Sequence, residues 1–340
     1  MDLGQFDYCL PDQLIAKRPC VPREFSRMLV CDAGFKDDKF INFFNYLDDK
    51  DIIVVNNSKV MPIFLIGIIK NQEIKVTLHK EINSLTWLAF TRPSKKLNSG
   101  DEIYFSKKIN AKVLEKRNFG EAVISFNCDD EDLNSYIQDQ GKMPLPPYIL
   151  KSRDSDSKDF IDYQTVYAKN FGSVAAPTAG LHFDHTIIKK LKDNNQLVEI
   201  TLHVGSGTFQ PIRDTIESHQ MHSEYGIITE ESASKILKCK KNGGRVISVG
   251  TTTLRLIETG SLKTGEIDSY EGETDIFIKP GFNFNTVDLL LTNFHLPKST
   301  LLLLVSAFAG TEKIKKLYDY AINMKYRFFS YGDVTLLYRK

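Results

Sequence analysis

The stretch RVISVGTTTLRLIET, residues 245–259, predicts a buried strand that turns directly into a helix. Its first half is a run of Val and Ile broken only by one serine, which is typical of a strand covered on both faces. Gly250 and three threonines follow, and an amphipathic segment begins there. A strand, a short turn and a helix together form the repeating unit of α/β folds.

Other segments share this design. Residues 51–60 (DIIVVNNSKV), 197–209 (LVEITLHVGSGTF) and 288–308 (DLLLTNFHLPKSTLLLLVSAF) each place an apolar run before a small or polar turn. In the last segment Ser299 or Thr300 could cap a helix. The stretch SVAAPTAGLHF, residues 173–183, indicates a strand end and a turn, with Asp184 as the N-cap of the next helix. We therefore expect an α/β fold with a mostly parallel sheet.

The turns that follow these strands are expected to lie together. Parallel strands end at one edge of their sheet, and ligands of open α/β sheets bind at that edge. All five turns are rich in small or polar residues. The sequence therefore predicts one shared pocket, lined by residues 56–59, 177–182, 205–208, 251–255 and 293–298.

Residues 62–128 have a different pattern. Short alternating segments such as IKVTLHK, TWLAFTR and EAVISF are broken by Gly100, Gly120 and Asn-Ser pairs. Strands at intervals of about ten residues are typical of a small barrel or sandwich. The predicted organisation is an α/β domain formed by residues 1–61 and 151–340, with a β-barrel domain and its connecting segment inserted at 62–150.

Net charge alone does not indicate a partner, because the 340-residue chain carries only +1. The charge is unevenly distributed, with a balance of +5 over residues 61–128 and of +4 over 311–340. Two basic regions would suit a polyanion such as a nucleic acid. A solvated, lysine-rich face is the plainer alternative.

Cysteine usage and apolar runs indicate the compartment. The five cysteines are odd in number and scattered, so a disulfide framework is not expected and a reducing interior suits the chain. No secretory signal pattern opens the sequence, and its longest apolar run, residues 300–310, is too short to cross a bilayer. We expect a cytoplasmic protein with no membrane role.

Three histidines, His182, His203 and His295, fall in or beside the predicted strand-end loops. A histidine titrates near neutral pH and is the usual general acid or base, although a single histidine is more often structural. The motif HQMHSEY, residues 219–225, adds two histidines and a glutamate. Its spacing differs from that of a zinc-binding helix and no further ligand cluster is evident, so no metal is expected, and an active-site or structural hydrogen-bonding role is favoured.

Two loops carry signals for ligand binding. In HVGSGTF the backbone N–H groups of residues 205–208 can approach a ligand closely, although a tight strand-end turn is the alternative. In GTTTLR the residues Thr251, Thr252 and Arg255 stand at a helix start, where free N–H groups and the helix dipole favour a carboxylate. Capping by a single threonine would be the simpler explanation of that loop.

Taken together, these motifs resemble one family, the S-adenosylmethionine:tRNA ribosyltransferase-isomerases of queuosine biosynthesis. The resemblance spans nearly the whole chain and keeps the order of the family's motifs. The matching stretches are FDYCLPDQLIAKRP, SRMLV, NNSKVMP, RPSKKLNSGDEI, GKMPLPPYI, YQTVYAKNFGSVAAPTAGLHF, TLHVGSGTFQPI, HQMHSEY, GGRVISVGTTTLR, TDIFIKPGF, LLTNFHLPKSTLLLLVSAFAG and YRFFSYGD.

The resemblance implies a reaction. The ribosyl part of S-adenosylmethionine would be transferred to the aminomethyl group of 7-aminomethyl-7-deazaguanine in tRNA and isomerised, giving epoxyqueuosine-tRNA, adenine and methionine. It also implies an α/β domain with an inserted β-barrel. S-adenosylmethionine would be a consumed substrate, so neither a metal nor a redox cofactor is expected.

The resemblance also implies a set of site residues. Proton transfers would fall to His182, His203 and His295, and the residues leave open which histidine plays which part. Contacts to S-adenosylmethionine and the modified base are expected from Asn56, Ser58, Lys59, Pro177, Thr178, Ala179, Gly180, Gly205, Ser206, Gly207, Thr208, Thr251, Thr252, Arg255 and Asn293. Contacts to tRNA are expected from Arg92, Lys95 and Lys96 on the barrel.

The chain departs from the family pattern at two places. Asn57 stands where an aspartate is usual, and Ile63 with Phe64 replaces an Ala-Arg pair. The missing arginine weakens the case for a phosphate contact at that turn.

Two rival functions are open on the sequence alone. A methyltransferase would carry a glycine-rich loop after its first strand and an acidic residue after its second, and that pair is not found. A non-catalytic RNA-binding module would bind tRNA in a salt-sensitive way without turnover.

Overall fold

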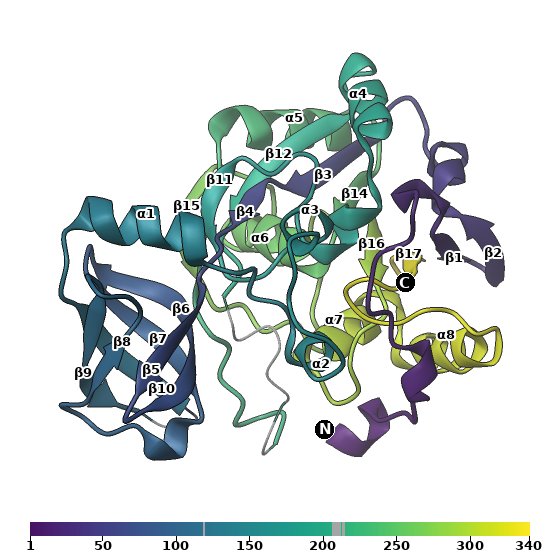
Figure 1. Ribbon diagram of the computed structural model, residues 1–340. Helices are drawn as coiled ribbons and strands as arrows, with labels where there is room; N and C mark the ends of the chain where they lie inside the picture. The colour runs from purple at the N-terminus through teal and green to yellow at the C-terminus, as the bar shows by residue number, and fades with distance from the viewer. Residues whose placement is uncertain (118–119, 206–211, 213–214) are drawn as a thin grey trace. The chain divides into compact units, whose positions relative to one another are not determined.

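The computed structural model describes residues 1–117, 120–205, 212 and 215–340. The chain divides into two compact units (Figure 1). The first comprises Met1–Lys59, Gln164–Phe171 and Ala176–Lys340, and the second comprises Val60–Tyr163 and Gly172–Ala175. The division thus falls at Lys59 and Tyr163, where the sequence predicted boundaries at 61 and 150.

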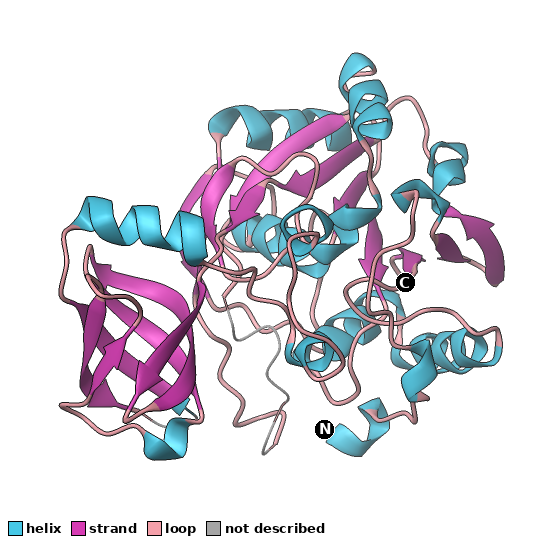
Figure 2. Cartoon of the chain, viewed as in Figure 1, coloured by secondary structure: helices cyan, strands magenta, loops and turns pink. Residues whose placement is uncertain are grey.

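The first unit is built on one large sheet, whose strands are drawn in magenta in Figure 2. The central strands β12, β3, β14 and β16 are parallel to one another, whereas β2, β13 and β15 join antiparallel to their neighbours. In spatial order the strands are β15 (Tyr270–Thr274), β13 (Glu224–Ile228), β12 (Leu197–Leu202), β3 (Ile52–Asn56), β14 (Val246–Val249), β16 (Leu289–Asn293), β17 (Val334–Tyr338), β1 (Arg27–Cys31) and β2 (Phe35–Lys39). The predicted α/β class is confirmed, and the sheet is mixed at its flanks.

The helices of this unit begin where the sequence predicted them. Asp184 accepts a hydrogen bond from the N–H of Ile187 and so caps α4, and Ser299 caps α7 in the same way through Leu302. The bounds are α4 (His185–Asp193), α5 (Glu230–Lys241), α6 (Thr251–Ser261), α7 (Thr300–Ala309) and α8 (Thr311–Asn323). Short 3-10 helices are η1 (Leu3–Phe6), η2 (Asp12–Leu14), η3 (Arg23–Phe25), η4 (Phe40–Tyr46) and η7 (Thr178–His182).

One hydrophobic cluster covers a face of this sheet. Alternate strand residues share a face because successive side chains of a strand point to opposite sides. Burial of each such side chain stabilises the fold by about 1.5–3 kcal/mol. The cluster joins Ile53 and Val55 of β3, Ile247 and Val249 of β14, and Leu289 and Leu291 of β16 to Ile187, Ile188 and Leu191 of α4 and to Phe40 and Phe43 of η4.

The segment before the turn at 177–180 differs from expectation. The strand there, β11 (Asn170–Ser173), ends three residues before Ala176. It pairs with the short strand β4 (Ser58–Val60) in a separate two-stranded sheet and does not join the large one. A continuous apolar strand pattern is missing here, because Asn170 and Gly172 lie within the strand.

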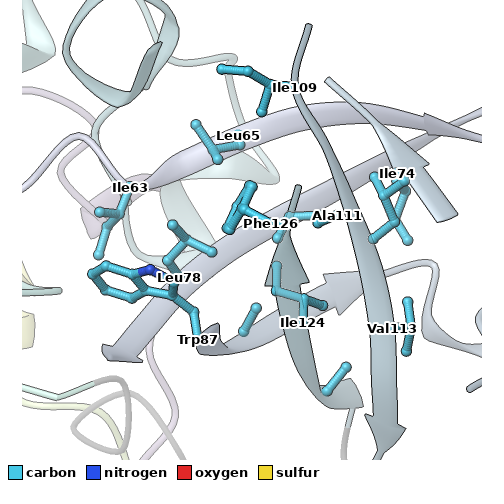
Figure 3. Packing of buried hydrophobic residues seen from close by; sticks show 14 of the residues in the cluster. Ile63, Leu65, Ile74, Leu78, Trp87, Ile109, Ala111, Val113, Ile124 and Phe126 are labelled. Atoms are coloured by element: carbon cyan, nitrogen blue, oxygen red, sulfur yellow. The ribbon is translucent and has the colours of Figure 1, made fainter. Parts of the chain in front are cut away.

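The second unit contains the predicted closed barrel. The order of its antiparallel strands is β10 (Glu121–Phe126), β7 (Thr86–Arg92), β6 (Gln72–Asn83), β5 (Phe64–Ile69), β8 (Glu102–Tyr104) and β9 (Asn110–Lys116). Apolar side chains from alternate positions, among them Leu65, Leu78 and Ile124, fill its interior (Figure 3). Also in this unit are η5 (Ser94–Lys96), α1 (Asp130–Gln140), α2 (Pro147–Leu150) and α3 (Asp159–Asp162). The alternation of polar and apolar residues did not predict β5, because all its residues are apolar.

Within the described ranges no helix is both long and apolar enough to cross a membrane. The five cysteines are all free thiols.

Candidate functional site

The ends of β3, β12, β14 and β16, where four of the predicted turns begin, lie at one edge of the sheet. The Asn56 side chain, at the end of β3, donates from Nδ2 to the Leu202 carbonyl at 2.9 Å and accepts from the Leu202 N–H at 2.9 Å. On the other side, the Gly250 N–H donates to the Leu291 carbonyl at 2.8 Å. The ends of β12, β3, β14 and β16 are therefore joined side by side.

The topology singles out one place along this edge. From β3 the chain returns to the sheet at β12, whereas from β14 the next central strand is β16, on the opposite side. Neighbouring strands whose connections diverge leave a crevice between their carboxyl ends, and α/β proteins bind ligands in such crevices. The residues at this switch point are Asn56–Lys59 after β3 and 250–255 after β14.

His182 lies inside the fold at this edge, with both ring nitrogens occupied. Nδ1 is 2.7 Å from Ser26 Oγ, and Nε2 is 3.2 Å from Asn293 Nδ2. Because Asn293 Oδ1 accepts from the Thr178 hydroxyl at 2.9 Å, its amide nitrogen faces the histidine as donor, and the histidine proton sits on Nδ1. Burial, together with the cations of Arg327 and Arg23, lowers the pKa of His182 to about 3. The ring is neutral at physiological pH.

His295 is held in a similar way. Its Nε2 lies 2.9 Å from the Thr292 hydroxyl, and its backbone N–H donates to the Tyr318 hydroxyl at 2.8 Å. The Tyr8 hydroxyl donates to its backbone carbonyl. Burial lowers the pKa of His295 to about 3. His295 is therefore a hydrogen-bonded part of the core.

His203 differs from the other two. Its ring lies nearly parallel to that of Tyr225, with 6.4 Å between centroids. Its Nδ1 is buried and has no hydrogen-bond partner in the described part of the chain. Burial lowers the pKa of His203, so the imidazole is neutral at physiological pH.

The helix start at GTTTLR contains a buried ion pair. Arg255, with 4% of its surface exposed, donates from Nη1 to Glu224 Oε2, and Glu224 is 5% exposed. Glu224 Oε1 accepts from the Gly205 N–H at 2.8 Å. Thr251 and Thr252 are also buried at the first turn of α6. The loops at 205 and 251–255 are thus linked through Glu224, for whose motif HQMHSEY the sequence favoured an active-site or structural hydrogen-bonding role over a metal.

Asn57 replaces the expected aspartate with a hydrogen-bond donor. Its Nδ2 lies 3.3 Å from Glu199 Oε2, and its Oδ1 accepts from the Thr201 hydroxyl at 2.7 Å. Burial raises the pKa of Glu199, but hydrogen bonds from Lys169 and Asn57 outweigh this effect and lower it. Next to it, Ser58 is fully buried, and Lys59 Nζ lies 4.4 Å from the centre of the Phe171 ring.

The turn at 177–180 is shaped by packing. Pro177 precedes η7, and Thr178 bonds to Asn293 as described above. A Cβ at Gly180 would lie 1.9 Å from the Tyr167 hydroxyl oxygen, so only glycine fits beside that ring. Ala179 is buried in the same cluster as Tyr167. Ser26 and Tyr167 are neighbours of this turn that the sequence analysis missed, because Ser26 lies 156 residues from His182 and the contact of the Tyr167 ring with Gly180 forms only in the fold.

The remaining predicted residues fall into two groups. Ser206, Gly207 and Thr208 lie outside the described residues. Arg92, Lys95 and Lys96 are exposed on the barrel, and Lys96 donates a hydrogen bond to Gln72 Oε1. Where β6 pairs with β7, Arg92 lies opposite Lys75, which is also exposed. Among the described residues no cluster of three or more His, Cys, Asp or Glu side chains could hold a metal ion.

Comparisons with known proteins point to one family. The model of a family described as queuosine biosynthesis protein matches residues 3–337. An S-adenosylmethionine:tRNA ribosyltransferase-isomerase of Parvibaculum lavamentivorans is 44% identical over 347 residues, which cover 99% of each chain. A protein of the same name from Dinoroseobacter shibae is 45% identical over 99% of this chain and 98% of its own length. A crystal structure of S-adenosylmethionine tRNA ribosyltransferase from Thermotoga maritima is 32% identical, with a TM-score of 0.55 over 98% of this chain and 99% of that one.

Proposed function

The chain belongs to the family of queuosine biosynthesis proteins and is a transferase of the S-adenosylmethionine:tRNA ribosyltransferase-isomerase type, and we propose the following substrates and products for it. It transfers the ribosyl part of S-adenosylmethionine to 7-aminomethyl-7-deazaguanine in tRNA and isomerises it. The products are epoxyqueuosine-tRNA, adenine and methionine. The observation that supports this proposal is the position of the turns at 56–59 and 250–255 at the switch point of the sheet, in a chain related over its whole length to such enzymes.

The proposed chemistry consists mainly of proton transfers. The sulfonium acidifies the adjacent C5′ hydrogen of ribose, so a base must remove it. The attacking amine must be uncharged, and adenine must gain a proton or a hydrogen bond as it leaves. General acid–base catalysis of such a step contributes about 10²–10⁴-fold in rate. Leaving groups of this kind need neither a metal nor a redox cofactor, and S-adenosylmethionine is consumed as a substrate.

The proposed proton-transfer groups are His203, His182 and His295. Among them His203 suits the role best, because its buried Nδ1 has no partner among the described residues. His182 and His295 are neutral rings whose nitrogens already have partners. For these two, a direct role requires that a substrate replace Asn293 or Thr292 as the hydrogen-bond partner.

The proposed binding groups surround the same edge. Thr251, Thr252 and Arg255 take the methionine carboxylate, since a helix start favours an anion. Asn56, Ser58, Lys59, the turn at 177–180, residues 205–208 and Asn293 surround adenosine and the modified base. On the barrel, Arg92, Lys95 and Lys96 contact the tRNA backbone, whose phosphates attract exposed cations. The proposed compartment is the cytoplasm.

One experiment separates this reaction from its rivals. The protein is incubated with S-adenosylmethionine and a tRNA that carries 7-aminomethyl-7-deazaguanine, and all products are identified by mass spectrometry. Free adenine and methionine are expected in equal amounts with the epoxyqueuosine nucleoside. A methylated tRNA with S-adenosylhomocysteine would instead indicate a methyltransferase, and tRNA binding with no turnover would indicate a binding module.

A further inference from the structure

The hydroxyl of Thr178 ends a hydrogen-bond network whose other members, Ser26, His182 and Asn293, are buried. These three residues are 2%, 5% and 4% exposed. Within residues 173–183, Thr178 is the single residue that is not buried. Its side chain is therefore the part of the network that a ligand can reach.

We propose that Thr178 is a hydrogen-bond acceptor for S-adenosylmethionine: its Oγ1 accepts from an N–H or O–H group of the bound molecule. The inference rests on the proposed function. It adds the direction of the hydrogen bond at this turn, and hence the kind of group that the turn selects.

The orientation of the Asn293 amide sets the direction of the network. Its Nδ2 lies 3.4 Å from the Asp333 carbonyl oxygen and 3.2 Å from His182 Nε2. A carbonyl oxygen only accepts, so the atom that faces it must be the amide nitrogen. The amide oxygen, Oδ1, then faces Thr178 Oγ1 at 2.9 Å. Because an amide oxygen also only accepts, the Thr178 hydroxyl must donate to it.

The buried neighbours keep the amide in this orientation. His182 is a neutral ring whose Nδ1 lies 2.7 Å from Ser26 Oγ. With its proton on Nδ1, the ring offers Nε2 as an acceptor to Asn293 Nδ2. A reversed amide would bring the carbonyl oxygens of Asn293 and Asp333 against each other, and buried acceptors without a donor cost about 1–3 kcal/mol.

The direction of the network leaves Thr178 with lone pairs only. A threonine hydroxyl has one hydrogen and two acceptor sites, and the hydrogen of Thr178 is committed to Asn293. None of the described residues donates to the Thr178 hydroxyl oxygen. Toward a ligand, Thr178 can therefore only accept. A site of this kind binds a molecule with a matching donor and discriminates against one that lacks it.

The position of the turn indicates S-adenosylmethionine as the donor. A Cβ built on Gly250 would lie 3.6 Å from the Cβ of Ala179, so the turn at 177–180 packs against the residue that precedes helix α6. Thr251 and Thr252, which follow Gly250, are the proposed partners of the methionine carboxylate. The same molecule has donors at its ammonium group, its two ribose hydroxyls and its adenine amino group, and each of these could meet the acceptor.

The test is calorimetric binding to the intact wild-type protein and to Thr178→Val. The probes are S-adenosylmethionine and four analogues, which lack the ammonium group, the 2′-hydroxyl, the 3′-hydroxyl or the adenine amino group. Thr178→Val should bind S-adenosylmethionine about 10-fold more weakly than wild type, because a donor of the ligand loses its partner. One analogue, which lacks the donor that Thr178 receives, should bind equally to both proteins. The other three should bind to Thr178→Val as weakly, relative to wild type, as S-adenosylmethionine does.

Two further variants keep the test decisive if Thr178→Val does not fold, which thermal melting reveals. Thr178→Ala also removes the hydroxyl and should give the same pattern, whereas Thr178→Ser keeps the acceptor and should recover most of the affinity. Thr253→Val is the matched control, because its hydroxyl donates to the Val249 carbonyl, and it should leave every affinity unchanged.

Two results would overturn this inference alone. One is equal binding of S-adenosylmethionine to wild type and to the variants without the hydroxyl. The other is a loss of the same size for all five probes, since that would mean that the hydroxyl supports the fold and receives no donor. Wild type that binds none of the probes would overturn the proposed function, and this inference with it.

Discussion

Asn293 and His182 form a hydrogen bond that fixes the protonation state of the histidine: the amide Nδ2 donates to Nε2 across 3.2 Å. Nε2 must therefore carry no proton, and the imidazole is neutral. Since Ser26 occupies Nδ1, protonation of the folded ring would break the bond to Asn293. A buried side chain that accepts no proton in the folded state makes the stability of the protein depend on pH.

Acid is expected to destabilise the protein through this histidine. An unfolded histidine gains a proton below its ordinary pKa of 6.5, whereas folded His182 gains one only near 3. The unfolded state therefore binds more protons between these values, and for this group the free energy of unfolding falls by about 1.4 kcal/mol for each unit by which the pH is lowered. In His182→Gln that slope should be smaller by this amount, measured by urea denaturation between pH 6.5 and 4. The exposed His185→Gln serves as control; equal slopes in both variants would contradict the assignment.

Gly180→Ala is expected to destabilise the first unit by about 1–3 kcal/mol, because the added methyl group would overlap the Tyr167 hydroxyl. Tyr167→Phe in the same chain should recover part of the loss, since the hydroxyl has no partner in the described residues and its removal costs little. Gly34→Ala, where a Cβ meets nothing within 4 Å, is the control. Chemical denaturation of wild type, Gly180→Ala, Tyr167→Phe, the double variant and the control provides the measurement, and additive effects of the two substitutions would exclude the clash.

Asn57→Asp is expected to lower stability at pH 8 by about 1–3 kcal/mol, because it replaces a donor with a second carboxylate beside Glu199. The loss should shrink at pH 5, where one carboxyl of the pair takes a proton and donates again. Adding Glu199→Gln should restore a donor and recover stability at pH 8. A loss that is independent of pH would mean that the two side chains do not interact in this way.

His203→Ala is expected to lower turnover by about 10²–10⁴-fold while S-adenosylmethionine still binds, if Nδ1 transfers a proton in the reaction. Single-turnover kinetics and a binding measurement separate the two effects. The exposed His185→Ala should leave both unchanged. Turnover near that of wild type would remove His203 from the proton-transfer groups.

Arg92, Lys95 and Lys96 changed together to alanine should weaken tRNA binding and reduce its salt dependence by roughly 2–3 in the slope of log K against log salt. The barrel offers a control of equal charge in the exposed Lys107, Lys108 and Lys112. Similar losses in both triple variants would show that overall charge, and not this face, attracts tRNA.

Much of the fold was predictable because its signals are local. An apolar run, Gly250 and an amphipathic stretch identify β14 and α6 within 15 residues, and capping serine and aspartate side chains mark the starts of α7 and α4. β5 was missed because its continuous apolar run lacks the alternation that marks its neighbours.

The environments of the site residues were not predictable in the same way. Burial keeps His182 neutral, and its ring nitrogens contact Ser26 and Asn293, which lie 156 and 111 residues away along the chain. Arg255 of α6 is paired with Glu224 of β13. Residue type and spacing identified these positions as reactive groups, but only tertiary contacts decide which ring nitrogens and charges are already paired. The pattern around Gly180 likewise indicated an open turn, whereas the glycine is required by the Tyr167 ring.

The pairing of β3 has a consequence for the order of events during synthesis. Ile53 is paired with Leu197 on one side and with Ile247 on the other. Met28 of β1 is paired with Val334 of β17. The barrel, in contrast, closes with strands that all lie between residues 64 and 126. A nascent chain can therefore complete its barrel early. The sheet lacks its central strand pairs until residues near 250 emerge, and it is complete only when β17 is made. Pairing between strands so far apart in the sequence is expected to make the sheet fold slowly.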